Sequence, residues 1–215
     1  MNFLEGDKDV VKLKICGLKT PQDIALVNNF QPDYVGFVLA PSKRQVSLET
    51  AYHLKSLLAP GIRTVGVFVN EPLTRVMAYI AQGIIDDVQL HGDENLAYIK
   101  ALKEEGRIPI IKAIRVKNQE AFTKEQRTLI ESEWLDYPLF DTYSPTAYGG
   151  SGMSFNWGSL KDVKRPYFLA GGINANNIRE AIELAPYAID VSSGVEVEGS
   201  KDAIKIKELL MKMKA

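Results

Sequence analysis

Two side chains capable of acid–base chemistry occur where strands are expected to end. Cys16 closes the apolar run 11–16, and Asp141 lies near the end of the run 135–142. A thiolate is both a base and a nucleophile, and Lys14 on the same strand face would favour the thiolate form of Cys16. A carboxyl group serves as a general acid or base when its surroundings tune its pKa. The structural alternatives are a small buried thiol and a carboxylate that anchors a loop.

Glycine-containing loops follow the last two expected strands, 166–170 and 188–193. Barrel proteins often bind a phosphate group between these two loops, through backbone N–H groups and the start of a short helix. A Cβ would hold phosphate oxygens away from the backbone, so a side chain at Gly194 should weaken phosphate binding more than folding. Tight turns without a ligand are the alternative. The residues expected to bind phosphate are Gly171, Gly172, Ser192, Ser193 and Gly194.

Three further polar residues are expected to bind a substrate. Arg44 follows the second expected strand, and its planar guanidinium suits a carboxylate ligand, although most exposed arginines form only weak surface pairs. Gln89 and His91 share one face at the end of the fourth expected strand. A structural histidine is the alternative to one that contacts the substrate.

The composition excludes several classes of protein. Cys16 is the only cysteine, which rules out a disulfide scaffold and a cysteine-based metal cluster. No helical histidine pair, Walker loop or dinucleotide-binding glycine pattern occurs, so neither a metal nor a cofactor is predicted. The 26 Lys and Arg residues balance 27 Asp and Glu residues, which argues against nucleic-acid or membrane binding. No run is long enough to span a bilayer and residues 1–10 do not resemble a signal peptide, so we expect a cytoplasmic protein.

Apolar residues switch repeatedly between a period of two and a period of about 3.6, which predicts strands followed by helices. No linker or charge block divides the chain, so residues 1–215 are expected to form a single domain with an N-terminal extension over 1–10. The expected strands are 11–16, 33–39, 63–69, 87–91, 108–116, 135–142, 166–170 and 188–193. The expected helices are 21–29, 47–58, 73–82, 94–105, 118–133, 175–184 and 202–213.

Eight strand-then-helix units imply parallel strands with right-handed crossovers. A compact α/β fold, the single-domain (β/α)8 TIM barrel, accommodates them, and an open doubly wound sheet is the alternative. The strand faces favour the barrel. Lys14 and Cys16 share one face of the first strand, whereas both faces of an open parallel sheet should be apolar. The inner face of a barrel can be polar near the carboxyl ends of its strands, where sites lie.

Segments along nearly the whole chain resemble, in their order and spacing, the phosphoribosylanthranilate isomerase family of tryptophan biosynthesis. The segments are Lys14-Ile-Cys-Gly, Val35-Gly-Phe, Ser42-Lys-Arg, Val65-Gly-Val-Phe-Val-Asn, Val88-Gln-Leu-His-Gly-Asp-Glu, Phe140-Asp-Thr, Gly149-Gly-Ser-Gly, Leu169-Ala-Gly-Gly-Ile, Asp190-Val-Ser-Ser-Gly-Val-Glu and Gly199-Ser-Lys-Asp.

The resemblance implies a cofactor-free (β/α)8 barrel that carries out an Amadori rearrangement. The phosphorylated small-molecule substrate would be N-(5-phosphoribosyl)anthranilate and the product 1-(2-carboxyphenylamino)-1-deoxyribulose 5-phosphate. The resemblance also implies that Cys16 is the general base, that Asp141 is the general acid and that Arg44 faces the anthranilate end. The phosphate site would lie in the two glycine loops. No protein partner is implied.

Two features depart from the family pattern. The segment Phe155-Asn156-Trp157 stands where the family usually has Phe-Asp-Trp, which removes a carboxylate that would order a loop. The extension over 1–10 is longer than usual. The glycine-rich segment 148–152, which lies just before Phe155, is expected to fold over the substrate.

The implied acid and base need opposite protonation states. Reference pKa values of about 3.9 for Asp and about 8.5 for Cys make a protonated Asp141 beside an ionised Cys16 rare at every pH. We therefore expect the site to lower the pKa of Cys16, to raise that of Asp141, or to do both when the substrate binds. Lys14 would lower the first, and closure of the loop 143–152 would raise the second.

Two other functions fit parts of the pattern. Another sugar-phosphate barrel enzyme, such as a pentose-phosphate epimerase or indole-glycerol-phosphate synthase, would use metal-binding histidines or a catalytic lysine, and only Lys14 or Lys112 is placed for that role. A non-catalytic barrel that binds a phosphorylated metabolite would need neither an acid nor a base at separate strand ends.

Overall fold

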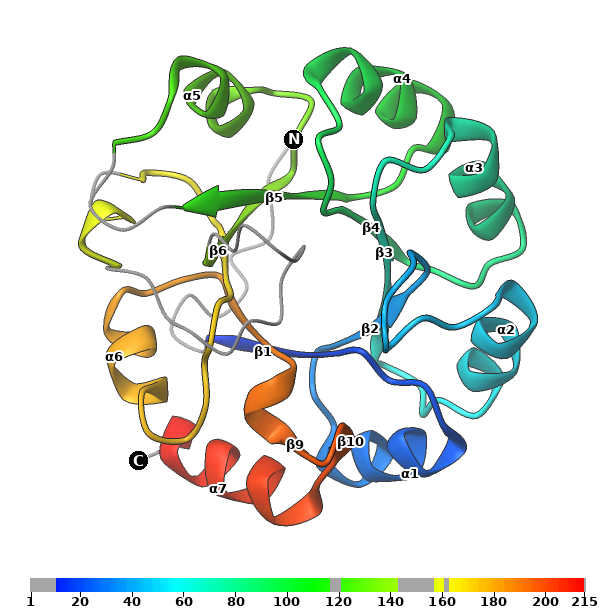
Figure 1. Ribbon diagram of the computed structural model, residues 1–215, viewed down its shortest axis with the longest axis vertical. Helices are drawn as coiled ribbons and strands as arrows, with labels where there is room; N and C mark the ends of the chain where they lie inside the picture. Colours follow the sequence, from blue (N-terminus) through cyan, green and yellow to red (C-terminus); the bar gives the residue numbers. More distant parts are fainter. Residues whose placement is uncertain (1–10, 117–120, 143–156, 161–162, 215) are drawn as a thin grey trace.

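Eight parallel strands close into one barrel, in which each strand pairs with the next and β8 pairs with β1. The computed structural model describes residues 11–116, 121–142, 157–160 and 163–214. Figure 1 shows the helices arranged around the ring of strands. This closure confirms the TIM barrel rather than the open sheet. The barrel strands are β1 (Lys12–Cys16), β2 (Tyr34–Val38), β3 (Arg63–Phe68), β4 (Asp87–Leu90), β5 (Ile110–Val116), β6 (Tyr137–Thr142), β7 (Phe168–Leu169) and β8 (Ala188–Val191).

Several of the helices begin at a residue whose side chain caps the first turn. At the start of α1, the Asp23 N–H donates to Thr20 Oγ1 at 3.1 Å and the Thr20 N–H donates to Asp23 Oδ2 at 3.0 Å. This capping box satisfies backbone donors that a helix start leaves free. The described helices are α1 (Pro21–Phe30), α2 (Leu48–Ser56), α3 (Leu73–Ala81), α4 (Leu96–Gly106), α5 (Lys124–Glu131), α6 (Ile178–Glu183) and α7 (Ala203–Lys214), with 3-10 turns η1 (Trp157–Leu160) and η2 (Ser193–Val195).

The strands separate two apolar layers. Outward-facing residues such as Leu13 and Ile15 pack against the helices in the larger cluster. Inward-facing residues such as Val65, Ile111 and Phe168 fill the barrel in a smaller cluster. Because side chains alternate along a strand, Lys14 and Cys16 face the barrel interior. This alternation places polar side chains inside the barrel, toward the carboxyl ends of its strands.

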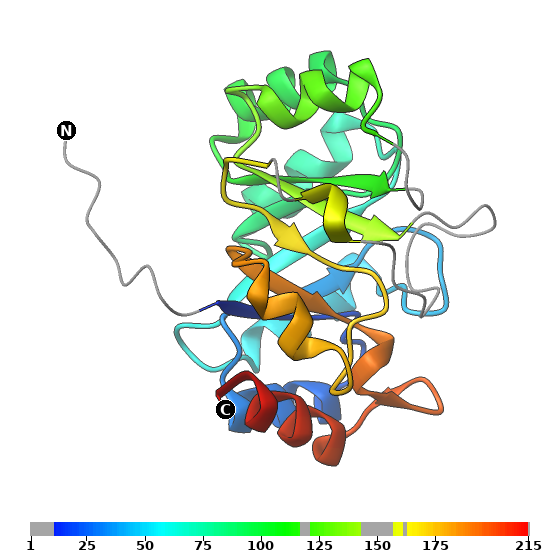
Figure 2. The ribbon, with the colours of Figure 1, turned by 90° about the vertical axis from the view of Figure 1, so that its left-hand side faces the viewer.

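A two-stranded hairpin that was not predicted follows the barrel, formed by β9 (Glu196–Val197) and β10 (Ser200–Lys201). Glu198 and Gly199 have φ values of 48° and 79°, as the two central residues of a type I′ turn require. Figure 2 shows this hairpin projecting on the side to which the arrowheads of β5 and β6 point. The hairpin therefore lies at the carboxyl ends of the strands.

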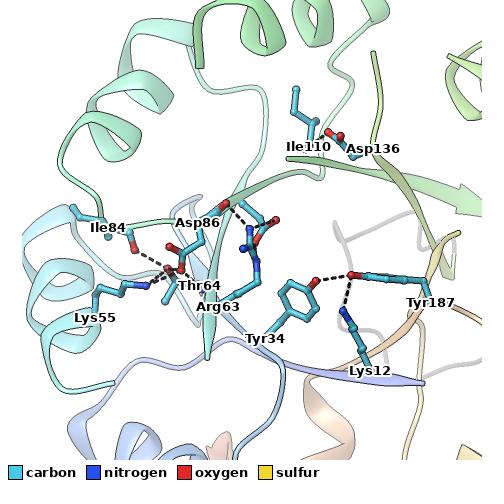
Figure 3. A network of polar contacts seen from close by, with 11 residues as sticks. Lys12, Tyr34, Lys55, Arg63, Thr64, Ile84, Asp86, Ile110, Asp136 and Tyr187 are labelled. Carbon is cyan, nitrogen blue, oxygen red and sulfur yellow. Dashed lines mark hydrogen bonds and ion pairs between the residues drawn. The ribbon is translucent and has the colours of Figure 1, made fainter. Parts of the chain in front are cut away.

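Aspartates form a recurring clamp at the amino-terminal end of the barrel. Each aspartate directly precedes an even-numbered strand and accepts a backbone N–H from the strand before it. Figure 3 shows the second and third of these clamps. The three clamps join Asp33 to Leu13, Asp86 to Thr64 and Asp136 to Ile110, with N···O distances of 2.9, 2.7 and 2.7 Å.

Lysines from the outer helices bind two of the clamps. Lys55 of α2 donates to Asp86 Oδ2 at 2.7 Å, and Lys103 of α4 donates to Asp136 Oδ2 at 2.6 Å. Tyr187 takes the aspartate's place before β8, and its hydroxyl accepts from Lys12 Nζ at 2.9 Å (Figure 3). The amino-terminal end of the barrel is thus held by polar contacts between neighbouring strands.

Some expectations concern residues outside this description. The N-terminal extension 1–10, the loop 143–152 and the segment 155–156 are not among the described residues, and the single-domain organisation stays a prediction. Among the helices described, none has the length and apolar character needed to cross a membrane.

Candidate active site

The predicted base and acid, and the predicted substrate-binding residue His91, lie at the carboxyl ends of the strands. Cys16 ends β1, His91 directly follows β4, and Asp141 is the residue before the end of β6. Their exposed fractions are 9%, 8% and 5%. Since parallel barrel strands all end at one mouth, residues far apart in the sequence meet there.

Cys16 lies against the neighbouring strand β2. Its register partner is Gly36, and a Cβ on Gly36 would be 2.6 Å from Cys16 Sγ, so the glycine leaves room for the thiol. The Lys14 ammonium favours the ionised form of this thiol and donates a hydrogen bond to Asp190 Oδ2 at 2.9 Å. These side chains form a buried cluster that joins β1 to β8.

The charges in this cluster offset one another. Burial raises the pKa of Cys16 and Asp190 raises it further, although Lys14 acts in the opposite direction. Burial lowers the pKa of Lys14, but Asp190 and Cys16 outweigh this effect and the pKa is raised. Burial also raises the pKa of Asp190, against the attraction of Lys14. In the free protein, burial is the largest effect and outweighs Lys14, so the pKa of Cys16 is raised. The expected change in the pKa of Cys16 or Asp141 on substrate binding stays a prediction.

His91 lies between Gln89 and Asp141. Gln89 Nε2 is 2.9 Å from His91 Nδ1, and since an amide nitrogen only donates, a neutral ring accepts at Nδ1 and carries its proton on Nε2. His91 Nε2 is 3.2 Å from Asp141 Oδ2, but the pair is not aligned as a hydrogen bond. Asp141 Oδ1 accepts the Thr142 N–H at 2.8 Å. The predicted acid thus faces an imidazole and is oriented by a backbone donor.

A buried ion pair holds the segment that follows His91. Lys112 Nζ donates to Glu94 Oε2 at 2.9 Å and to Gly92 O at 2.7 Å. Glu94 in turn accepts the N–H groups of Asn70 and Gly92 at 2.7 and 3.0 Å. Burial lowers the pKa of Lys112, an effect that Glu94 opposes. This pair ties the ends of β3, β4 and β5 together, so Lys112 supports the position of His91.

Arg44 is paired with a residue that the sequence did not single out. Its Nε and Nη2 donate to the two carboxylate oxygens of Glu196 at 2.8 and 2.7 Å, and Lys201 Nζ donates to Oε1 at 2.7 Å. Burial raises the pKa of Glu196, but Arg44 and Lys201 outweigh it and bring this pKa to about 2. Val195 and Val197 alternate with Glu196 ahead of Gly199, but three residues are too few to predict a strand from the sequence.

The two glycine loops touch each other. A Cβ on Gly194 would lie 1.9 Å from Ile173 O, a backbone atom of the other loop. The expectation that a side chain at Gly194 disturbs phosphate binding more than folding is therefore wrong, because the other loop occupies that space. Gly172, Ser193 and Gly194 line an open hollow of about 330 Å³ between the loops and α7.

The phosphate-site candidates also contact the acid and the base. Gly171 has a φ of 90°, and a Cβ there would lie 2.4 Å from Thr142 Oγ1 and 3.1 Å from Asp141 Oδ1. Ser192 Oγ donates to Cys16 O at 3.1 Å. The loops are thereby built against β1 and β6. Among the described residues, no group of three or more His, Cys, Asp or Glu side chains is arranged to hold a metal ion.

Comparison with known proteins gives independent evidence. Residues 13–212 match the family model described as N-(5'phosphoribosyl)anthranilate (PRA) isomerase. A relative from Endomicrobium trichonymphae, named N-(5'-phosphoribosyl)anthranilate isomerase, is 48% identical over 200 residues, which are 92% of this chain and 95% of the relative. The crystal structure of phosphoribosyl anthranilate isomerase from Thermotoga maritima has a TM-score of 0.83 at 34% identity and covers 95% of this chain and 99% of that chain. A structure of the same enzyme type in complex with reduced 1-(o-carboxyphenylamino)-1-deoxyribulose 5-phosphate has a TM-score of 0.79 at 33% identity, with the same coverage.

Proposed function

The chain belongs to the N-(5'-phosphoribosyl)anthranilate isomerase family of tryptophan biosynthesis, and we propose that it performs the isomerisation with Cys16 as general base and Asp141 as general acid. One observation carries these roles. The thiol on β1 and the carboxyl group on β6 are both buried at the mouth of the same barrel. A substrate held there has an acid on one side and a base on the other.

The roles follow the order of the bond changes. Asp141 protonates the furanose ring oxygen, the ring opens, and the anthranilate nitrogen forms an iminium bond to C1′. The iminium acidifies the C2′ hydrogen, which the Cys16 thiolate removes to give an enolamine. Cys16 then protonates C1′ while the enol hydroxyl returns its proton to Asp141. The product is the ketose, and both residues recover their starting protonation.

The two ends of the substrate require different partners. The phosphate group would lie at the hollow lined by Gly172, Ser193 and Gly194. Backbone N–H groups at such loops and at a helix start are typical phosphate ligands. The anthranilate carboxylate would approach Arg44, which its ion pair with Glu196 holds at the mouth. The related enzyme that binds a reduced product analogue supports a ligand with this chemistry. Fixing both ends places C2′ between acid and base.

Two substitutions test the acid–base assignment. Cys16→Ala and Asp141→Asn should each lower kcat by about 10²- to 10⁴-fold, the usual contribution of general acid–base catalysis. Turnover of phosphoribosylanthranilate generated in situ is followed by the loss of anthranilate fluorescence. Glu104→Gln, which removes an exposed carboxylate on α4, is the control and should keep full activity. Full activity in either site variant, at an unchanged melting temperature, would remove that residue's role.

The proposed base also favours a particular compartment. Cys16 can act only as a free thiol, and cytoplasmic reductants keep thiols reduced. We therefore expect the protein in the cytoplasm, and cell fractionation with an antibody to the chain would check this.

A further inference from the structure

Charged groups from four parts of the barrel act on Cys16. Lys14 comes from β1 itself, Asp190 from β8, Lys201 from β10 and Arg44 from the segment after β2. Lys201 and Arg44 are both bound to the carboxylate at the start of β9. Lys14 differs from them, because its own partner, Asp190, also acts on the thiol.

Asp190 uses only part of its carboxylate in this ion pair. Oδ2 accepts from Lys14 Nζ at 2.9 Å, whereas Oδ1 is buried and finds no hydrogen-bond partner among the described residues. The side chain of Asp190 is 8% exposed and that of Lys14 is fully buried. Asp190 also lies within electrostatic range of Asp141 and of the His91 ring. A buried carboxylate oxygen without a donor is unfavourable, which indicates a group that gains a donor when the site fills.

We propose that Asp190 is a positioning residue that controls the protonation of Cys16 through Lys14. While Asp190 holds the Lys14 ammonium, the negative charge of Asp190 offsets part of the stabilisation that Lys14 gives to a thiolate, and the buried Cys16 remains a thiol. A hydroxyl group of the bound sugar phosphate that donates to Asp190 Oδ1 weakens this hold, and Lys14 then stabilises the thiolate. This inference rests on the proposed role of Cys16 as base and adds what converts the thiol into a base.

The proton that leaves Cys16 goes to solvent. Cys16 must be ionised before it removes the C2′ hydrogen, so the sulfur first releases its proton. The Lys14 ammonium then balances the negative charge on the sulfur.

The test is the pH dependence of Cys16 alkylation by iodoacetamide, which reports one site because Cys16 is the only cysteine. Asp190→Asn removes the opposing charge and keeps the side-chain shape, so the alkylation midpoint should fall by about one to three pH units. Lys14→Met removes the cation and should raise the midpoint by a similar amount. The variant with both substitutions has lost both charges and should return toward the wild-type midpoint.

Steady-state kinetics give a second readout. The pH profile of kcat/KM reports the free enzyme and that of kcat reports the substrate complex. In the wild type, the ionisation assigned to the base should occur at lower pH in kcat than in kcat/KM. In Asp190→Asn the two profiles should coincide, because the hold on Lys14 is already absent. A residue with only a structural role would not change this difference.

The controls separate this proposal from the proposed function. Glu104→Gln removes an exposed negative charge on α4 and should leave the alkylation midpoint unchanged. An unchanged or raised alkylation midpoint in Asp190→Asn would overturn the proposal. A lowered midpoint in Lys14→Met would also overturn it. If Asp190→Asn does not fold, the result for Lys14→Met decides alone. If both midpoints shift as expected but Cys16→Ala keeps full turnover, the charge coupling is supported and the proposed base is wrong.

Discussion

Replacing Gly171 with alanine should displace Asp141, the proposed general acid, without changing the Asp141 side chain itself. Gly171 has a φ of 90°, and its added Cβ would lie 2.4 Å from Thr142 Oγ1 and 3.1 Å from Asp141 Oδ1. Ordinary contacts of a Cβ begin at 3.4 Å, so Thr142 must move by roughly 1 Å to accommodate the methyl group. Asp141 is bonded to Thr142 and accepts its N–H, so the carboxyl group moves with it.

Gly171→Ala is expected to lose both stability and activity, and the two losses can be measured separately. The positive φ costs a residue with a side chain about 1–2 kcal/mol in stability. This corresponds to a fall in melting temperature of about 2–4 °C per kcal/mol for a chain of this size. A misplacement of about 1 Å at a catalytic centre lowers the rate about 10²-fold, and this should appear in kcat. KM should change much less, because the methyl group does not point at the hollow between the glycine loops.

Gly61→Ala is the matched control. Gly61 has a φ of 93°, yet a Cβ there would meet nothing within 4 Å, so this variant carries the backbone strain alone. Gly61→Ala should lower the melting temperature and keep full kcat. Gly171→Ala should lower both. If Gly171→Ala retained kcat while losing stability like the control, the contact with Asp141 would have no bearing on catalysis.

Two further predictions concern the ion pairs around the mouth. Lys112→Met should destabilise the protein by about 3–5 kcal/mol, because it leaves Glu94 buried without a cation. The double variant with Glu94→Gln should recover part of this loss. Chemical denaturation measures both. The Glu196 carboxyl has its pKa lowered from 4.5 to about 2, so its ion pairs stabilise the folded state above pH 4.5 and are lost as the pH falls toward 2. Glu196→Gln should therefore have a lower free energy of unfolding than the wild type at pH 6, and this difference should shrink as the pH falls from 4.5 toward 2. A difference in stability that does not depend on pH would contradict this assignment.

The alternation of strands and helices made the fold predictable from the sequence. Cys16 and Asp141 were placed at strand ends by local patterns, and the structure has both at the barrel mouth. The strand expected over 166–170 shortens to Phe168–Leu169, in part because Pro166 has no N–H to give to the sheet. The hairpin was missed because each of its strands has only two residues, too few for a period to be seen.

Local sequence patterns could not predict which residues pair with the charged groups. Lys14 pairs with a residue 176 positions away, and Arg44 pairs with one 152 positions away. These contacts exist only because the barrel closes and its last loops return to the first strands. The direction of the Cys16 pKa could not be predicted from the nearby lysine alone, because burial of the thiol is the largest effect and Asp190 adds to it. Neither the burial nor the distant carboxylate can be seen in the local sequence.

The three aspartate clamps hold β1 to β2, β3 to β4 and β5 to β6. Each clamp joins two consecutive strands, and the lysines Lys55 and Lys103 link one pair to the next. A break at the exposed Pro60–Gly61 turn falls between pairs, so it separates no aspartate from the backbone N–H that it binds. A circularly permuted chain that starts there keeps every clamp within a continuous stretch of sequence. Six of the eight strands thus form three clamped pairs, and opening the chain between two of these pairs leaves the clamps intact.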